Sequence, residues 1–453
     1  MLSINPATGK TVAEYEEYAP AEVAAIIDRS AKGFRDWRHE PIERRCEPLR
    51  SAAKILRQER EQLAILMANE MGKPLAEGRA EIDKCAWVCD YYADEAAEQL
   101  APEIIPTDAS ESRVVFEPLG VVLAVMPWNF PFWQVFRFAA PALAAGNAGL
   151  LKHASNVSGC ALAIEKIWKK SGLPDGLFRS LLLGSPRVEE VLGHESVAAV
   201  SLTGSTPAGQ AVARRAGELL KKCVLELGGS DPYVILEDAD LESAAEACAT
   251  GRLINGGQSC IAAKRLIVDA SVQVEFEGLL AETMKRRVVG DPLDEDTDIG
   301  PIARHDLRDE LHQQVVRSVD AGATCRLGGE LPDGPGAYYP PTMLSGVSPG
   351  MPAFDEELFG PVAAVVRADG EEDAIRLAND SPFGLGAAVF TQDLDRGREI
   401  ATKHLEAGSC FVNAFVRSDP RLPFGGVKQS GFGRELGAFG IREFVNVKTI
   451  WVA

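Results

Sequence analysis

The chain has 453 residues and a net charge of −19, from 66 acidic and 47 basic side chains. This length is enough for two or three domains with a large buried core. The acidic balance argues against nucleic acids and anionic membranes as partners, because both repel a negative surface. No segment has the pattern of a signal peptide or of a bilayer-spanning run of about 18 apolar residues. Nine scattered cysteines without a CxxC pair predict a reducing compartment, most simply the cytoplasm.

The first hundred residues are predicted to be largely helical. Apolar residues recur at helical spacing in the segments 20–37, 43–73 and 80–100. Cys85 and Cys89 lie four residues apart in the last of these and are interpreted as core residues on one helix face. None of the six histidines has the spacing of metal ligands, so no metal is predicted.

Strands alternate with helices from about residue 112 onward. Strand-like runs occur at 113–118, 120–127, 148–152, 178–184 and 197–204, and helical segments follow the last three. A second region begins near 229, with strand-like runs at 232–236, 265–269, 362–368, 386–390, 409–413 and 445–453. The alternation predicts an α/β fold with a parallel, doubly wound sheet followed by a second α/β region.

Three side chains and one loop are candidates for chemistry. Cys260 lies in the glycine-rich segment NGGQSC, where a thiol could be a positioned nucleophile or simply a core cysteine. Glu226 ends a strand-like run before two glycines, so it could be a general base, a cap or an ion-pair partner. Asn129, in MPWNFP, could stabilise an oxyanion or occupy a turn. The loop 204–209, GSTPAG, opens a helix and could bind phosphate, but it is neither a Walker A loop nor GxGxxG.

The order of the motifs is more specific than any one of them. The chain contains, in order, MPWNFP, LLKHAS, TGSTPAG, ELGGSDP, GQSC, EELFGP and PFGGVKQSGFGRE. Over residues 2–452 it therefore resembles the aldehyde dehydrogenase superfamily. The segments LLKHASN, PFWQVFRFAAPALAAGNAGL and RSDPRLPFGGVKQSG are most similar to those of bacterial succinate semialdehyde dehydrogenases.

The resemblance implies a role for each catalytic candidate. Cys260 would attack the aldehyde to form a thiohemiacetal, and Asn129 with the Cys260 backbone N–H would hold the oxyanion. Hydride transfer to a nicotinamide would leave a thioester, which water activated by Glu226 would hydrolyse.

The expected reaction is oxidation of succinate semialdehyde to succinate. The alternatives are a broader enzyme for glutarate semialdehyde or for aliphatic and aromatic aldehydes, an acylating enzyme that makes acyl-CoA, and a catalytically silent relative. The presence of Glu226 disfavours the acylating enzyme, and the presence of all three residues disfavours the silent relative.

The resemblance also implies a dinucleotide site. Lys152 would meet the adenosine ribose, Ser205 the pyrophosphate and Glu357 the nicotinamide ribose. The other implied contacts are Gly204, Gly209, Trp128 and Phe359. NAD-preferring relatives have a glutamate three residues after the lysine, where this chain has Ser155. A glutamate would repel the 2′-phosphate of NADP, so its replacement by serine predicts that NADP is preferred and NAD is the second cofactor.

The substrate pocket is expected around the helix after Asn129. Trp133 and Arg137 follow Asn129 at +4 and +8, which is helical spacing on one face. We expect Arg137 to bind the distal carboxylate of the aldehyde together with Ser418. The alternatives are a structural ion pair for Arg137 and a carboxylate-binding role for Arg417.

The implied architecture has three parts. A Rossmann-type cofactor domain would comprise residues 1–111 and 121–228, and an α/β catalytic domain would comprise 229–430. A small β oligomerisation element would pair 112–120 with 440–453. The exposed edge of such a terminal strand would be covered by a second subunit, so a homodimer or homotetramer is expected.

Overall fold

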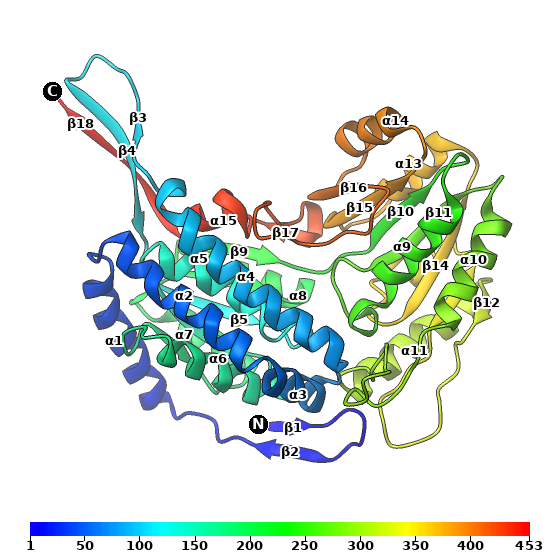
Figure 1. Ribbon diagram of the computed structural model, residues 1–453, viewed down its shortest axis with the longest axis horizontal. Helices are drawn as coiled ribbons and strands as arrows, with labels where there is room; N and C mark the ends of the chain where they lie inside the picture. The colour runs from blue at the N-terminus through cyan, green and yellow to red at the C-terminus, as the bar shows by residue number, and fades with distance from the viewer.

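The computed structural model describes residues 1–453 and shows two lobes and a projecting arm (Figure 1). The three predicted helical segments form four helices at the start of the first lobe: α1 (Pro20–Trp37), α2 (Ile42–Gln58), α3 (Arg60–Met71) and α4 (Leu75–Gln99). The segment 43–73, predicted as one run, is interrupted at Glu59 between α2 and α3. A hairpin that the sequence analysis did not predict precedes them, made of β1 (Leu2–Ile4) and β2 (Thr11–Glu14). The loop of this hairpin reaches the second lobe, where the Ala337 N–H donates to the Pro6 carbonyl at 2.8 Å.

The first lobe is built on a six-stranded sheet of order β17-β9-β8-β5-β6-β7. Its strands are β5 (Val121–Met126), β6 (Ala148–His153), β7 (Phe178–Ser180), β8 (Val197–Thr203), β9 (Lys222–Glu226) and β17 (Gly431–Phe432). All neighbours are parallel except β17, which returns from the end of the chain and pairs antiparallel with β9. The chain runs from β5 outward to β7 and then to β8 on the other side of β5. That reversal creates a crevice at the carboxyl ends of the central strands, where α/β sheets bind ligands.

Helices join these strands, as the β-α alternation predicts. They are α5 (Trp133–Ala144), α6 (Ser158–Lys170), α7 (Val188–Gly193) and α8 (Thr206–Glu218). All residues of α5 are buried, because it packs against β5 and β6 on one side and against α2 and α4 on the other. Side chains that α5 presents at its first turns are therefore held firmly inside the lobe.

The second lobe contains a seven-stranded sheet of order β12-β13-β14-β11-β10-β15-β16. Its strands are β10 (Asp231–Ile235), β11 (Ala263–Asp269), β12 (Thr324–Leu327), β13 (Thr342–Ser345), β14 (Val362–Ala368), β15 (Gly386–Phe390) and β16 (Ser409–Val412). Only β12 is antiparallel to its neighbour. The accompanying helices are α9 (Leu241–Leu253), α10 (Gln273–Lys285), α11 (His305–Asp320), α12 (Pro352–Asp355), α13 (Glu371–Asn379) and α14 (Leu394–Glu399). The predicted α/β fold class is confirmed.

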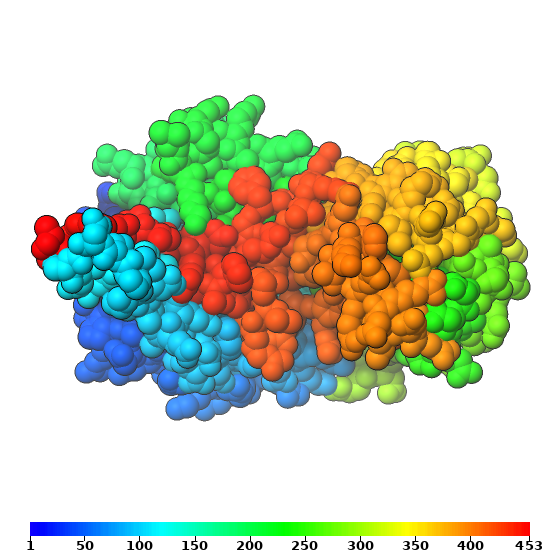
Figure 2. Space-filling view, turned by 90° about the horizontal axis from the view of Figure 1, so that it is seen from above, coloured from blue at the N-terminus to red at the C-terminus, as the bar shows by residue number.

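The arm is a three-stranded antiparallel sheet at the end of the first lobe (Figures 1 and 2). It consists of β3 (Glu103–Ile104), β4 (Glu111–Pro118) and β18 (Val445–Val452), and the short helix α15 (Gly437–Arg442) precedes β18. β4 pairs with β18 of the same chain from Val445 opposite Pro118 to Val452 opposite Glu111. Strand β3 lies inside the range predicted for the cofactor domain but belongs to this sheet. No helix of the chain is both long and apolar enough to cross a membrane.

Candidate active site

Asn129 follows β5 in the first lobe, and Cys260 precedes β11 in the second, yet hydrogen bonds join their loops. Asn129 Nδ2 donates to the Gln258 carbonyl at 3.0 Å, and Asn255 Nδ2 donates to the Asn129 carbonyl at 2.7 Å. Gln134 Nε2 donates to Asn129 Oδ1 at 3.1 Å, which turns the amide nitrogen toward the loop of Cys260. An amide nitrogen carries two hydrogens, so one N–H of Asn129 remains available for an oxyanion.

The loop before Cys260 has an uncommon backbone conformation. Asn255, Gly256 and Gly257 have φ angles of 56°, 61° and 75°, in the left-handed region that favours asparagine and glycine. A Cβ at Gly257 would lie 2.2 Å from the Gly360 carbonyl oxygen. The segment that carries Glu357 and Phe359 therefore packs directly on this loop, and only glycine allows that approach.

Arg252, at the end of α9, ties the same two segments together. Its side chain is fully buried, and Nη2 donates to the carbonyls of Gly257 and Gly360, each at 2.6 Å. A buried guanidinium is costly unless its donors are satisfied, so these carbonyls are essential partners. Arg252 therefore fixes the loop of Cys260 relative to the segment of Glu357.

Cys260 is half-buried, with two basic groups, Lys264 and Arg137, and two acidic groups, Glu357 and Asp231, near enough to act on its charge. Burial raises the pKa of its thiol to about 12, although Lys264 and Arg137 act in the opposite direction. Lys264 Nζ donates to the Cys260 carbonyl at 2.7 Å and pairs with Glu357 at 3.1 Å. The thiol is therefore neutral at neutral pH, and nucleophilic attack requires removal of its proton.

Glu226, the last residue of β9, is 2% exposed, and neither carboxylate oxygen has a hydrogen-bond partner. Burial and the neighbouring Glu435 hold the pKa of Glu226 well above its usual range, and Arg137 opposes the shift. A Cβ at Gly425 would lie 2.7 Å from Glu226 Oε1, so the glycine leaves room for the carboxylate. A buried carboxylate with a raised pKa and unoccupied oxygens is suited to take a proton from water.

A cavity of about 170 Å³ opens onto Cys260. It contains the three predicted substrate residues Trp133, Arg137 and Ser418. Most of the remaining wall is apolar, formed by Phe130, Ile254, Ile261, Phe415, Val416 and Phe424. Cavities of similar size hold a benzene ring, so this one suits a short aldehyde.

Arg137 lies in the wall of this cavity, but its charge is already neutralised. The guanidinium forms a buried ion pair with Glu435 and lies over the Phe424 ring, 4.8 Å from the ring centre. Arg137 Nη2 also donates to Thr203 Oγ1 at 3.3 Å. The structural ion pair, which the sequence analysis kept as the alternative, is thus present beside the cavity.

The predicted cofactor residues gather at the carboxyl ends of β5, β6 and β8. Ser205 is the exposed N-cap of α8, and its hydroxyl makes no capping hydrogen bond. A Cβ at Gly209 would lie 2.5 Å from Leu227, so the first turn of α8 packs closely on the end of β9. The Gly204 N–H donates to the Glu226 carbonyl at 2.9 Å. Free N–H groups at a helix N-terminus form a ready anion site.

Other predicted cofactor residues flank this helix terminus. Lys152 is the penultimate residue of β6, is 6% exposed and donates to Ser185 Oγ at 3.1 Å. Ser155 begins the short 3-10 turn η1 (Ser155–Val157) and is exposed to solvent. On the Cys260 side, Trp128 and Phe359 form an edge-to-face pair with ring centres 5.7 Å apart. These positions fit a nicotinamide dinucleotide laid from η1 across α8 to Phe359.

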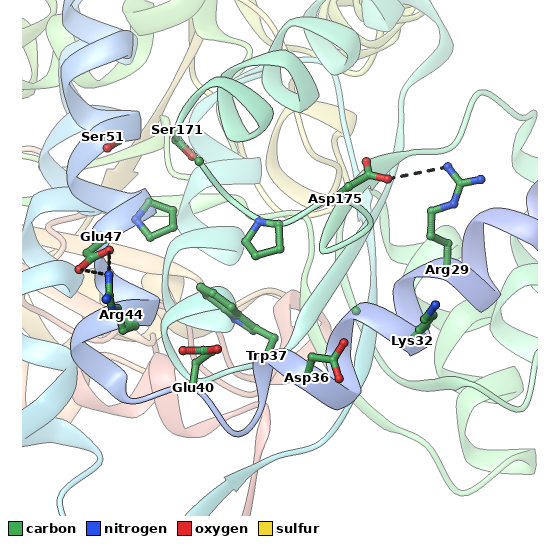
Figure 3. Close-up of a pocket in the computed structure, with 14 residues that line it drawn as sticks. Arg29, Lys32, Asp36, Trp37, Glu40, Arg44, Glu47, Ser51, Ser171 and Asp175 are labelled. Carbon is green, nitrogen blue, oxygen red and sulfur yellow. Dashed lines mark hydrogen bonds and ion pairs between the residues drawn. The ribbon is translucent and has the colours of Figure 1, made fainter.

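A larger hollow of about 750 Å³ lies elsewhere, between α1, α2 and the loop 171–175 (Figure 3). Its lining is almost entirely polar and charged, and several of those charges pair with one another. Arg44 contacts Glu47 at 3.3 Å, and Arg29 contacts Asp175 at 3.9 Å. It contains none of the predicted site residues, so the smaller cavity is the candidate active site. No three His, Cys, Asp or Glu side chains lie close enough together to hold a metal ion.

The chain belongs to the aldehyde dehydrogenase family, whose model matches residues 1–450. It is 52% identical over 453 residues, all of both chains, to a Synechocystis sp. protein named probable succinate-semialdehyde dehydrogenase, NADP(+). It is 47% identical over 450 residues, 99% of this chain and 97% of the other, to the succinate semialdehyde dehydrogenase, NAD(P)+, Sad of Escherichia coli. The predicted superfamily is confirmed.

Solved structures show the same relationship. The succinic semialdehyde dehydrogenase of Streptococcus pyogenes in complex with NADP+ superposes with a TM-score of 0.97 at 36% identity, covering 100% of this chain and 99% of that chain. Gox0499 superposes with a TM-score of 0.98 at 41% identity, with the same coverage. The overall fold is therefore that of this family.

Three residues of the site were not predicted from the sequence. Lys84, which lies on α4 and lines the cavity, and Arg252 of α9 occur in helices and have no motif around them. Glu435 was noted only as the last letter of PFGGVKQSGFGRE. Only one feature of the sequence could have pointed to Arg252. It is a basic residue in α9, a helix that is otherwise rich in alanine.

Proposed function

We propose that this protein oxidises succinate semialdehyde to succinate, with NADP as the preferred hydride acceptor and NAD as the second. The observation that carries the proposal is one small cavity that joins the Cys260 thiol to basic side chains. The aldehyde carbon would lie at the thiol, and the distal carboxylate would face the basic part of the wall. The names of the Synechocystis and E. coli relatives, at 52% and 47% identity, support the same substrate.

Cys260 in the cavity, together with Asn129 and Glu226, accounts for each bond that changes. Cys260 first releases its thiol proton to solvent, and the thiolate attacks the aldehyde carbon. The free N–H of Asn129 together with the Cys260 backbone N–H stabilises the oxyanion that forms. Bound NADP would supply the acceptor for the hydride that leaves the thiohemiacetal carbon. Glu226 takes a proton from water, and the water oxygen attacks the thioester carbon. The carbon–sulfur bond then breaks, and succinate and the Cys260 thiolate are released.

The positions described above support a set of cofactor contacts. Lys152 and Ser155 would hold the adenosine ribose with its 2′-phosphate, and Ser205 with the N–H groups of α8 would hold the pyrophosphate. Glu357 would hold the nicotinamide ribose. Gly204 and Gly209 would keep the loop open, and Trp128 and Phe359 would line the channel to Cys260. Position 155 is a serine and not an acidic residue, so no negative charge at this position would repel the 2′-phosphate of NADP.

Ser155→Glu is expected to reverse the cofactor preference. The new carboxylate would repel the 2′-phosphate and accept hydrogen bonds from the ribose hydroxyls of NAD. The ratio of kcat/KM with NADP to kcat/KM with NAD should fall by about 10–100-fold. Steady-state kinetics with both cofactors measure it, and Ser155→Ala is the control that removes only a hydroxyl. An unchanged ratio in Ser155→Glu would show that the 2′-phosphate lies elsewhere.

The substrate assignment is tested with three aldehydes, each with NADP and with NAD. Succinate semialdehyde is expected to have the highest kcat/KM, glutarate semialdehyde a lower one because it is longer than the cavity favours, and butanal the lowest because it lacks a carboxylate. Comparable values for all three would support the broader aldehyde dehydrogenase instead. Assays with and without coenzyme A distinguish the acylating reaction from hydrolysis to the free acid, since only the acylating reaction yields an acyl-CoA.

We propose further that the chain forms a homodimer or homotetramer through its arm. Strand β18 is an edge strand, and it exposes Val447 by 62% and Trp451 by 53%. Exposed edges with large apolar side chains are typical of surfaces that pair with another copy.

All nine cysteines are unpaired, which supports a cytoplasmic location.

A further inference from the structure

Lys264 is a buried ammonium group close to Cys260 to which the reaction above assigns no role. It is the second residue of β11 and is 1% exposed. A turn that contains Cys260 and Ile261 precedes this strand, and the Ala262 N–H closes the turn on the Ser259 carbonyl at 3.2 Å. Lys264 Nζ donates to the Ser259 carbonyl at 2.9 Å and to the Cys260 carbonyl at 2.7 Å. These carbonyls belong to the two peptide groups that flank the Cys260 Cα, so the ammonium holds both.

The third partner of the ammonium is Glu357. Lys264 Nζ pairs with Glu357 Oε1 at 3.1 Å, and the same oxygen accepts from the Gly229 N–H at 3.1 Å. Three acceptors thus lie within 3.1 Å of a group that has three hydrogens. A buried charge that moves away from such partners loses charge-assisted contacts that water cannot replace. Lys264 is therefore a fixed point against the Cys260 turn.

One of the two peptide groups that Lys264 holds supplies the backbone donor for the oxyanion. The N–H of this peptide, that of Cys260, has no hydrogen-bond partner in the chain, so it is free to donate to a substrate oxygen. Its carbonyl, that of Ser259, accepts from both Lys264 and the Ala262 N–H, and two donors on one carbonyl fix the plane of the peptide. A hydrogen bond to a carbonyl also polarises the peptide group, which strengthens its N–H as a donor.

We propose that Lys264 is a positioning residue of the oxyanion site. Its ammonium group holds the Ser259–Cys260 peptide so that the Cys260 N–H faces the oxygen of the attacked carbonyl, and its charge stabilises the Cys260 thiolate before the attack. The inference rests on the proposed function, in which Cys260 is the nucleophile and its N–H is one of two oxyanion donors. It does not depend on which aldehyde is oxidised.

The charge of Lys264 acts on the thiol from its buried position. Burial raises the pKa of the Cys260 thiol to about 12; Lys264 and then Arg137 lower it, whereas Glu357 and Asp231 raise it. Removal of the ammonium group therefore makes the thiolate rarer at any given pH. This loss slows attack on every electrophile alike, whereas loss of the oxyanion donor slows attack on a carbonyl alone.

Two reagents that need neither NADP nor an aldehyde separate these two effects. In 4-nitrophenyl acetate the Cys260 sulfur attacks the carbonyl carbon, the carbonyl oxygen becomes an oxyanion, and 4-nitrophenolate leaves with the electron pair of the broken carbon–oxygen bond. In iodoacetamide the sulfur attacks a saturated carbon, and iodide leaves without formation of an oxyanion. Both reactions need the thiolate, so the ratio of their rate constants at one pH reports on the oxyanion site.

Lys264→Met keeps the length of the side chain and removes its charge and its donors, so both rate constants are expected to fall. The ester reaction should fall further, and the ratio of ester to iodoacetamide rate constants should decrease by about 10–100-fold, since loss of a whole oxyanion donor costs about 10²–10³-fold. Release of 4-nitrophenolate measures the first rate constant, and mass spectrometry of the peptide that contains alkylated Cys260 measures the second. A lysine that served stability alone would leave this ratio unchanged.

Lys264→Gln is the second variant. Its amide is neutral but keeps two N–H donors, so the iodoacetamide rate should fall as in Lys264→Met and the ratio should fall less. Lys285→Met is the matched control, because Lys285 is exposed on α10 of the same lobe. Its replacement should change each rate constant by less than about twofold.

The outcomes separate this inference from the proposed function. Wild-type enzyme without a preference for succinate semialdehyde over butanal would overturn the proposed substrate and leave the role of Lys264 standing. A burst of 4-nitrophenolate that persists in Cys260→Ala would overturn the nucleophile. A wild-type ratio in both Lys264 variants, with thermal unfolding midpoints that show them to be folded, would overturn the positioning role alone.

Discussion

Replacement of Cys260 by alanine is expected to lower kcat/KM for succinate semialdehyde by at least about 10⁴-fold. Without the thiol no thiohemiacetal forms, and the hydride would have to leave an aldehyde hydrate that nothing holds covalently. The measurement is NADPH formation in steady state together with a rapid-mixing trace of the first turnover. Both the initial burst and the steady rate should disappear, because the first covalent step precedes hydride transfer.

Cys410→Ala is the matched control for this experiment. Cys410 lies on β16, is half-buried like Cys260, and burial raises the pKa of its thiol to about 11. It does not line the catalytic cavity, so its replacement should leave turnover unchanged. Full activity of Cys260→Ala, or loss of activity in Cys410→Ala of normal stability, would contradict the assigned nucleophile.

The sequence predicted the strands that are buried on both faces. The run GVVLAVMP is apolar throughout because β5 lies in the middle of a parallel sheet with helices on both sides, and it was recognised for that reason. The four-residue strands β12 and β13 were not predicted, since so short a run shows no period. Helix α11 was missed as well, because charged and polar residues such as His305, Arg308 and Gln313 fill much of its surface.

The candidate site was predictable where a motif places a residue at a strand end, as for Asn129, Glu226 and Ser205. The helical spacing of Trp133 and Arg137 correctly indicated one face and one cavity. It could not reveal Glu435, which β17 and the following turn bring back from the end of the chain to Arg137. Lys84 lies in the polar-looking segment AEIDKCAWVC, where a lysine normally faces water. Only the packing of α4 against α5 and the segment of Ser418 turns it toward the cavity.

Replacement of Glu226 by glutamine is expected to stop the reaction after hydride transfer. Glutamine has almost the same shape but cannot take a proton from water, so thioester hydrolysis should slow by about 10²–10⁴-fold. Because neither oxygen of Glu226 has a hydrogen-bond partner, the substitution breaks no existing contact. Rapid mixing should then show a burst of NADPH close to one per active site, followed by a slow steady rate.

The raised pKa of Glu226 adds a pH dependence to this prediction. The carboxylate is the form that accepts a proton, and burial beside Glu435 raises the pKa at which this form appears. Steady-state turnover of the wild type should therefore rise with pH as Glu226 ionises, and the glutamine variant should lose this rise because its amide does not titrate. Mass spectrometry of the stalled variant should detect the acyl group on Cys260.

Two further observations decide which proton Glu226 removes. Hydroxylamine, a nucleophile that needs no base at neutral pH, should cleave the thioester and restore turnover of the glutamine variant. The pKa of about 12 of the Cys260 thiol means that its proton also needs an acceptor. If the burst vanished along with the steady rate, Glu226 would act on the thiol before the aldehyde is attacked, and the assignment to water would be wrong. A full burst with hydroxylamine rescue would instead require a different acceptor for the thiol proton.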